Sequence, residues 1–250
     1  IDMSIDLYHG NCLEIMQALP EHSADMILTD LPYATTPLHW DKLIPHEQMW
    51  ECYHRVCKPN SAIVLFGQEP FASHLRLSNE KEYRYDWYWE KERLTNVFQV
   101  KRRCGKTIEN IMVFYKEQPI YNPQKHEHVG KLVTNKIGEN ARFSETQSGE
   151  VKVKPLEYHD DGTRYPTQLL KFNRDNPRER LHPTQKPVAL LEYLINTYTN
   201  ENMVVLDSCM GSGSTGIAAI NTNRSFIGIE LDTNYYNISK QRITERQNEV

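Results

Sequence analysis

Short apolar runs alternate along the chain with segments in which apolar residues recur at helical spacing. The runs predict buried strands at residues 25–30, 61–66, 85–89, 110–115, 203–206 and 225–229. The spacing predicts helices at residues 12–19, 46–57, 187–198, 214–220 and 234–246. This alternation is typical of an α/β fold, so we expect a doubly wound sheet with helices on both faces.

Residues 129–167 depart from this pattern, because they are polar, lack strong periodicity and are rich in Gly, Ser, Thr and Asn. Such a stretch predicts an inserted loop region. The longest apolar runs have five residues, whereas a membrane-spanning helix needs about 20, so no membrane partner is expected. The chain also shows no basic and apolar leader, which favours a cytoplasmic location.

The composition narrows the class of protein further. A length of 250 residues fits one large domain or a core with a smaller insert. The five cysteines include no pair at C-x-x-C spacing, which argues against a disulfide scaffold or zinc module and for a reducing compartment. His126 and His128 lie two apart in a polar stretch, where solvated side chains are the simpler interpretation, so we expect no metal.

The net charge of −4 hides an uneven distribution along the chain. Residues 91–186 carry 19 Lys and Arg against 12 Asp and Glu, whereas the remainder carries 10 against 21. A basic middle region on an acidic body indicates either a surface that faces a polyanion or an ordinary solvated face. The densest basic cluster consists of Lys101, Arg102, Arg103 and Lys106, shortly after the aromatic run at residues 87–89.

A glycine-rich turn follows the predicted strand at residues 203–206. Gly211, Gly213 and Gly216 satisfy G-x-G-x-x-G, and glycine allows a ligand to approach the backbone closely. Glu230 ends the next strand, where a carboxylate can accept hydrogen bonds from ribose hydroxyls. Asp207 precedes the turn and suits a cationic amine better than a pyrophosphate. S-adenosylmethionine has that amine, a ribose and no phosphate; a structural turn with a surface glutamate remains the plain alternative.

A second motif, Asp30-Leu31-Pro32-Tyr33, follows the predicted strand at residues 25–30. It therefore lies at the carboxyl edge of the sheet, where α/β proteins bind ligands. Leu31 is held extended by the proline after it, and Pro32 has a fixed φ. The stiff loop presents a carboxylate, a carbonyl and an aromatic ring, which together can grip an amino group on a planar heterocycle. An ordinary loop with a capping aspartate is the alternative.

Together these motifs resemble the amino-methylating DNA methyltransferases of the β-type order, in which a catalytic D-P-P-Y motif precedes a D-P-F-x-G-S-G motif that binds S-adenosylmethionine. Asp30-Leu31-Pro32-Tyr33 resembles the first motif, and residues 207–213 resemble the second. Residues 182–187 match the H-P-T-Q-K-P element of the family, and residues 10–12 resemble its G-D-C. Leu31, Ser208-Cys209 and Asn11 depart from the family's proline, Pro-Phe and acid.

The resemblance implies a permuted Rossmann-like methyltransferase sheet and methyl transfer from S-adenosylmethionine to N6 of a flipped-out adenine in double-stranded DNA. It implies catalytic roles for Asp30, Leu31, Pro32 and Tyr33. The implied cofactor-binding residues are Asn11, Cys12, Asp30, Thr184, Gln185, Lys186, Asp207, Ser208, Cys209, Gly211, Ser212, Gly213, Glu230 and Leu231. On the ground of charge rather than resemblance, we expect Lys101, Arg102, Arg103 and Lys106 to contact the DNA.

The resemblance covers the chain outside residues 118–180, so we expect a catalytic half at residues 1–117 and a cofactor-binding half at 181–250. By elimination and by charge, we expect residues 118–180 to form a target-recognition insert. N4-cytosine transfer is the nearest alternative, although the family uses Ser in place of Asp30 for that reaction. A dinucleotide oxidoreductase and a catalytically silent DNA-binding module are more remote. A homodimer and a cognate restriction endonuclease are further partners that the family suggests.

Overall fold

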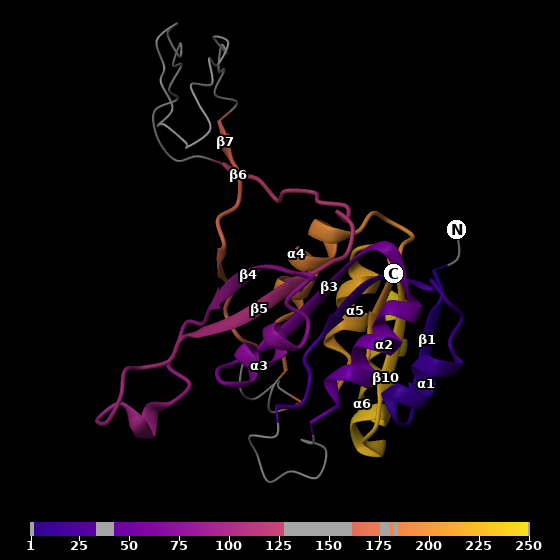
Figure 1. The fold of residues 1–250 in the computed structure, drawn as a ribbon, viewed down its shortest axis with the longest axis horizontal. Helices are drawn as coiled ribbons and strands as arrows, with labels where there is room; N and C mark the ends of the chain where they lie inside the picture. Colours follow the sequence, from indigo (N-terminus) through magenta and orange to yellow (C-terminus); the bar gives the residue numbers. More distant parts are fainter. Residues whose placement is uncertain (1–2, 34–42, 128–161, 176–180, 183–184, 250) are drawn as a thin grey trace, which may run out of the picture. The chain divides into compact units, whose positions relative to one another are not determined.

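The computed structural model describes residues 3–33, 43–127, 162–175, 181–182 and 185–249. In these residues an eight-stranded sheet runs in the order β1-β10-β9-β2-β3-β5-β4-β8 (Figure 1). Its strands are β1 Ile5–His9, β2 Ala24–Thr29, β3 Cys57–Gly67, β4 Tyr83–Glu90, β5 Ile108–Phe114, β8 Leu169–Lys171, β9 Val204–Asp207 and β10 Ser225–Glu230.

Every strand pair in this sheet is parallel except the two that involve β5. Because β5 is antiparallel to both β3 and β4, those two strands run in the same direction as β2. The strands β2, β3, β4, β9 and β10 therefore all end at one edge of the sheet, which we call the carboxyl edge. The loops that follow these strands meet there.

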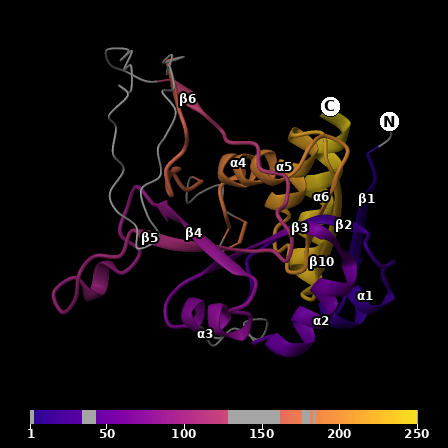
Figure 2. The same ribbon diagram turned by 45° about the horizontal axis from the view of Figure 1, so that its top comes forward.

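Helices cover both faces of the sheet. They are α1 Cys12–Ala18, α2 His46–Val56, α3 Phe71–Ser78, α4 Val188–Tyr198, α5 Ser214–Asn221 and α6 Thr233–Glu249. Figure 2 shows α1, α2 and α3 on one side of the sheet and α4 with α5 on the other. The predicted doubly wound α/β fold is confirmed.

Each face of the sheet has its own hydrophobic core. Met26 and Leu28 of β2 pack with residues of α4, α5 and α6, whereas Ile27 between them packs with residues of α1, α2 and α3. Neighbouring residues of one strand thus point into opposite cores, which is why the strand reads as a continuous apolar run. Trp87 and Trp89 are also buried in the first core, as strand side chains rather than as an exposed platform.

The sequence pattern missed β1 and α3, and it started β3 four residues too late, at residue 61. The residues of β1 are half-buried or exposed, so they form no apolar run. Helix α3 buries only Phe71, Ala72 and Leu75, too few to establish a helical period. The first residues of β3 include three exposed polar or proline positions, which masked the start of the strand.

A second compact unit consists of residues Pro123–Pro166, and the first comprises Ile1–Asn122 with Thr167–Val250. Within the second unit, β6 His126–Glu127 pairs with β7 Thr163–Arg164 in antiparallel orientation. Most of the predicted loop region at residues 129–167 lies outside the described residues. In the described part of the chain, no helix has the length and apolar character needed to cross a membrane.

Candidate active site

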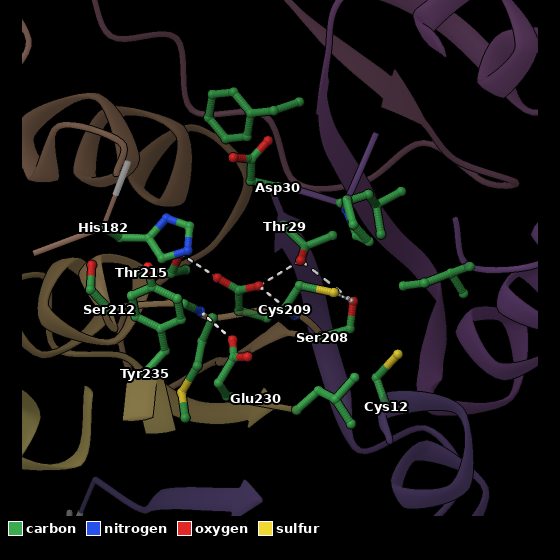
Figure 3. A pocket seen from close by; sticks show the side chains of 18 of the residues that line it. Cys12, Thr29, Asp30, His182, Ser208, Cys209, Ser212, Thr215, Glu230 and Tyr235 are labelled. Atoms are coloured by element: carbon green, nitrogen blue, oxygen red, sulfur yellow. Dashed lines mark hydrogen bonds between the residues drawn. The ribbon is translucent and has the colours of Figure 1, made fainter. Parts of the chain in front are cut away.

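A pocket of about 330 Å³ opens at the carboxyl edge, within the size range of small-ligand sites. Loops that follow β1, β2, β9 and β10 form its walls, together with residues from the H-P-T-Q-K-P segment (Figure 3). The predicted site residues that line it are Asn11, Cys12, Asp30, Leu31, Pro32, Tyr33, Gln185, Lys186, Asp207, Ser208, Cys209, Gly211, Ser212, Glu230 and Leu231. Thr184 lies outside the described residues.

The carboxylate of Asp207 is buried at the end of β9 and organises the turn after it. One oxygen accepts hydrogen bonds from Thr29 Oγ1 at 2.5 Å and from the Cys209 backbone N–H at 3.1 Å. The other accepts from Thr215 Oγ1 at 2.6 Å. Burial raises the pKa of Asp207 to about 6, although these hydrogen bonds oppose the shift. Asp207 therefore ties β2, the turn and the start of α5 together.

The glycine turn itself is shaped by two left-handed residues. Gly211 has φ +52° and Gly213 has φ +82°, values that a side chain disfavours. A Cβ on Gly213 would also lie 2.9 Å from the Cβ of Ser239 in α6. Gly213 thus packs the turn against α6 and does not line the pocket, unlike Gly211. The sequence predicted both glycines as cofactor contacts.

Glu230 points from the end of β10 toward this turn. Its carboxylate accepts hydrogen bonds from the backbone N–H groups of Gly211 and Asp232, each at 2.8 Å. Burial raises the pKa of Glu230. After the neighbouring strand β1, Asn11 caps α1 by accepting a hydrogen bond from Leu13 N at 2.9 Å, with Cys12 beside it in the pocket lining.

The H-P-T-Q-K-P segment closes another side of the pocket. Gln185 accepts a hydrogen bond from Ser212 Oγ at 3.1 Å and donates one to Asp175 at 2.7 Å. His182 packs edge-on against Tyr235, with ring centroids 4.2 Å apart. Through Gln185 the segment is therefore bonded directly to the glycine turn.

Asp30 emerges from β2 into a small network of charged and polar groups. Tyr33 donates a hydrogen bond to Asp30 Oδ1 at 2.6 Å, and Lys186 Nζ lies 2.6 Å from Asp30 Oδ2. Burial raises the pKa of Asp30, and the adjacent ammonium of Lys186 opposes this. Burial alone would lower the pKa of Lys186, but the carboxylates of Asp30 and Glu109 raise it above its usual value.

Sequence reasoning missed Glu109 and Lys91, which complete this network. Lys186 Nζ lies 2.9 Å from Glu109 Oε1, and Lys91 binds the other oxygen of the same carboxylate. Burial would raise the pKa of Glu109, but the two ammonium groups outweigh it and lower the pKa. Glu109 is the second residue of β5, so an acid at the start of an apolar strand was the only signal available.

The predicted DNA contacts lie outside the pocket. Lys101, Arg102 and Arg103 are exposed and Lys106 is half-buried. They belong to a segment at residues 91–107 that connects β4 to β5 and projects beyond those strands in Figure 1. Because β4 ends at the carboxyl edge and β5 begins there, this segment starts from the same edge as the pocket.

The charged groups of the pocket indicate the kind of ligand it suits. Its lining includes three carboxylates, from Asp30, Asp207 and Glu230, and the ammonium of Lys186. This balance disfavours a pyrophosphate, so it argues against a dinucleotide. A ligand with a positive charge and ribose hydroxyls fits the same set of groups, and S-adenosylmethionine has both.

Known proteins share these features. The DNA methylase model of the N6/N4 methyltransferases matches residues 24–241. The type II methyltransferase M.HpaI of Haemophilus parainfluenzae is 28% identical, over 96% of this chain and 74% of its own length. The DNA adenine methyltransferase YhdJ of Escherichia coli K12 is 27% identical, over 95% of this chain and 82% of its own.

Solved structures show the same fold. The crystal structure of the M1.HpyAVI–SAM complex has a TM-score of 0.63 at 28% identity and covers 95% of this chain and 99% of its own. The cytosine-N4-specific PvuII DNA methyltransferase has a TM-score of 0.67 at 17% identity, covers 99% of this chain and 93% of its own, and shows the fold alone. The family model spans most of the sequence, and the chain therefore belongs to the N6/N4 family of DNA methyltransferases, with S-adenosylmethionine as its cofactor.

Proposed function

We propose that this enzyme methylates N6 of an adenine that has been flipped out of double-stranded DNA. The observation that carries the proposal is the position of Asp30, whose carboxylate lines the cofactor pocket and is held there by Tyr33 and Lys186. A base inside a duplex cannot reach such a pocket, so the target nucleotide must leave the stack. The Escherichia coli relative YhdJ is a DNA adenine methyltransferase, which supports the same assignment.

The chemistry follows from what the D-L-P-Y loop offers to an amino group. N6 of adenine is a poor nucleophile because its lone pair is delocalised into the ring. The carboxylate of Asp30 and the carbonyl of Leu31 accept its two hydrogens and draw the nitrogen toward tetrahedral geometry. Bound S-adenosylmethionine supplies an electrophilic methyl group. Asp30 acts through positioning and electrostatics, and the proton leaves after transfer.

The neighbours of Asp30 keep it in the form that this role needs. The ammonium of Lys186 favours the ionised carboxylate, which can accept hydrogen bonds but cannot donate them. The hydroxyl of Tyr33 holds the other carboxylate oxygen, while its ring packs 4.8 Å from the ring of Phe71. In the proposal the free face of the Tyr33 ring stacks on the extrahelical adenine.

The remaining predicted residues hold the cofactor in this proposal. Glu230 binds the ribose hydroxyls, and Asn11 and Cys12 border the adenine. Gln185 and Lys186, with Thr184, close over the ligand, and Gly211 allows its methionine end to approach the turn. Asp207 already accepts three hydrogen bonds from the fold, so we assign it mainly to holding the turn in shape. Glu230 accepts only two, and its remaining lone pairs can bind the ribose. Residues 118–180 would read the DNA sequence.

N4-cytosine transfer is the second candidate, because the fold is shared with a cytosine-N4-specific enzyme. Asp30 favours adenine, since the family carries Ser at this position for cytosine.

The test is to express the chain in a bacterial host without DNA methyltransferases and to sequence modified bases in its DNA. We expect N6-methyladenine in one recurring motif. Asp30→Ala should abolish the modification while the purified protein still binds S-adenosylmethionine in calorimetry, and the exposed Asp6→Ala should change neither. N4-methylcytosine would overturn the adenine assignment, and unmodified DNA would overturn the function.

A further inference from the structure

The segment between β4 and β5, residues 91–107, carries an exposed aromatic side chain at its tip. Phe98 is 103% exposed, and Val97 and Val100 beside it are 59% and 43% exposed. An apolar side chain of this size gains free energy only when it leaves water. Three apolar residues gathered at one tip therefore indicate a surface that a partner covers. We call this segment the β4–β5 arm.

Hydrogen bonds within the arm fix its conformation. The side chain of Asn96 donates to Cys104 O at 2.9 Å and accepts from Lys106 N at 2.7 Å, so it bridges the loop. The backbone N–H of Thr95 donates to Lys106 O at 2.9 Å. A 3-10 turn, η1 Val97–Gln99, then presents Phe98 to solvent. These bonds stabilise a loop whose most exposed apolar side chain, Phe98, is left fully in solvent.

The charge of the arm identifies the class of partner. Residues 93–106 contain five Lys or Arg and no Asp or Glu. Lys101, Arg102 and Arg103 follow the tip directly and are exposed. An apolar tip among cations suits a partner that has flat apolar surfaces inside a polyanionic backbone, which describes a DNA duplex. Apolar wedges of this kind separate base steps in proteins that distort DNA.

The base of the arm is bonded to the catalytic loop. Lys91 binds Glu109, and Glu109 also lies beside Lys186, which in turn binds Asp30. The arm leaves the carboxyl edge at the point where β4 ends and β5 begins. The tip is therefore held in a defined relation to the residue that would receive the extruded base.

We propose that Phe98 inserts into the base stack beside the target nucleotide and keeps that nucleotide outside the duplex. The ring of Phe98 stacks in the place that the extruded base has vacated, and the cations after it bind the flanking phosphates. This inference rests on the proposed function, because it concerns the same flipped base.

The test compares two duplexes that carry the motif recovered from the modified DNA. One is fully paired, and the other has an abasic site opposite the target adenine, so that the base is already free. We expect Phe98→Ala to lower kcat/KM for methyl transfer about 10-fold or more on the paired duplex and by less than about 2-fold on the abasic one. Phe98→Trp should keep most of the activity on both.

Two controls separate insertion from other effects. Leu77→Ala removes another exposed apolar side chain, 74% exposed on α3, and should change neither rate. Lys101→Ala should weaken binding to both duplexes to the same extent, because a phosphate contact does not depend on whether the base is paired.

Several outcomes would overturn the insertion. One is an equal loss of kcat/KM on the two duplexes, and another is a Phe98→Ala variant whose kcat/KM equals that of the wild type. A third is a dimer, seen by sedimentation without DNA, that Phe98→Ala dissociates, because a second copy would then cover the tip. A wild-type chain that methylates no DNA would overturn the proposed function itself.

Discussion

Lys186 Nζ lies 2.6 Å from Asp30 Oδ2, although 156 positions separate the two residues in the chain. One belongs to the segment before α4 and the other to the loop after β2. The pair therefore links the part of the chain that would hold the cofactor to the part that would grip the substrate amine. Its partner Glu109 extends the same network to the β4–β5 arm.

Replacing Lys186 with Met should impair methyl transfer through the charge on Asp30. Burial already raises the pKa of Asp30, and Lys186 is the group that opposes this most strongly. Without the ammonium the pKa rises further, so a smaller fraction of Asp30 is ionised at neutral pH. We expect the acid limb of the kcat profile to move to higher pH. An acid limb that stays in place while kcat falls would contradict this account.

Glu109→Gln should destabilise the fold, because it leaves the buried ammonium groups of Lys91 and Lys186 facing a neutral amide. Breaking a buried ion pair from one side costs about 3–5 kcal/mol. The double variant with Lys91→Met should lose less than the sum of the two single variants. Urea unfolding of the four proteins in this cycle measures the coupling, and strict additivity would show that the contact contributes nothing.

The hydroxyl and the ring of Tyr33 have different roles, and two substitutions distinguish them. Tyr33→Phe loses the hydrogen bond to Asp30 and keeps the stacking surface, so it should lower kcat about 10-fold. Tyr33→Ala also loses the surface, worth about 1–3 kcal/mol per stacked base, and should lower kcat/KM further by about 5- to 150-fold. Steady-state kinetics on the recovered motif distinguish the two. Identical losses would mean that the ring does not touch the base.

Asp207→Asn should change how stability depends on pH. The pKa of Asp207 is raised to about 6 in the folded protein, against about 3.9 in an unfolded chain. The folded state thus binds its proton more tightly, and this contribution is full below pH 4 and is lost as the pH rises through 6. The wild type should lose roughly 3 kcal/mol across that window relative to the variant. If the free energies of unfolding of the two proteins, measured against pH, ran parallel between pH 4 and pH 6, this prediction would be refuted.

The apolar pattern was enough to find three of the four strands that position the pocket, because β2, β9 and β10 are buried on both faces, whereas β1 forms no apolar run and was missed. The motifs then placed Asp30, Asp207 and Glu230 at the ends of those strands, and all three line one pocket. Each of these residues carries its own local signal, either a turn after a strand or a proline that stiffens a loop.

Other parts of the site left no local trace in the sequence. Glu109 lies at the start of an apolar strand and meets lysines from two distant segments, so only the fold reveals its partners. Gly213 belongs to the same motif as Gly211, and only the structure shows that Gly211 lines the pocket while Gly213 leaves no room for a side chain beside Ser239. Phe98 looks like a core residue until its exposure is known.

The sheet order places β10 and β9 between β1 and β2, which are consecutive in the chain. During synthesis on a ribosome, β2 can pair early with β3, but β1 waits for β10 and β2 waits for β9, and both of these partners are encoded about 200 residues later. Both strands stay without these neighbours until the last 50 or so residues emerge. A chain that ends before β9 therefore lacks the loops after β9 and β10 that wall the pocket, so the pocket closes only when the last strands join the sheet.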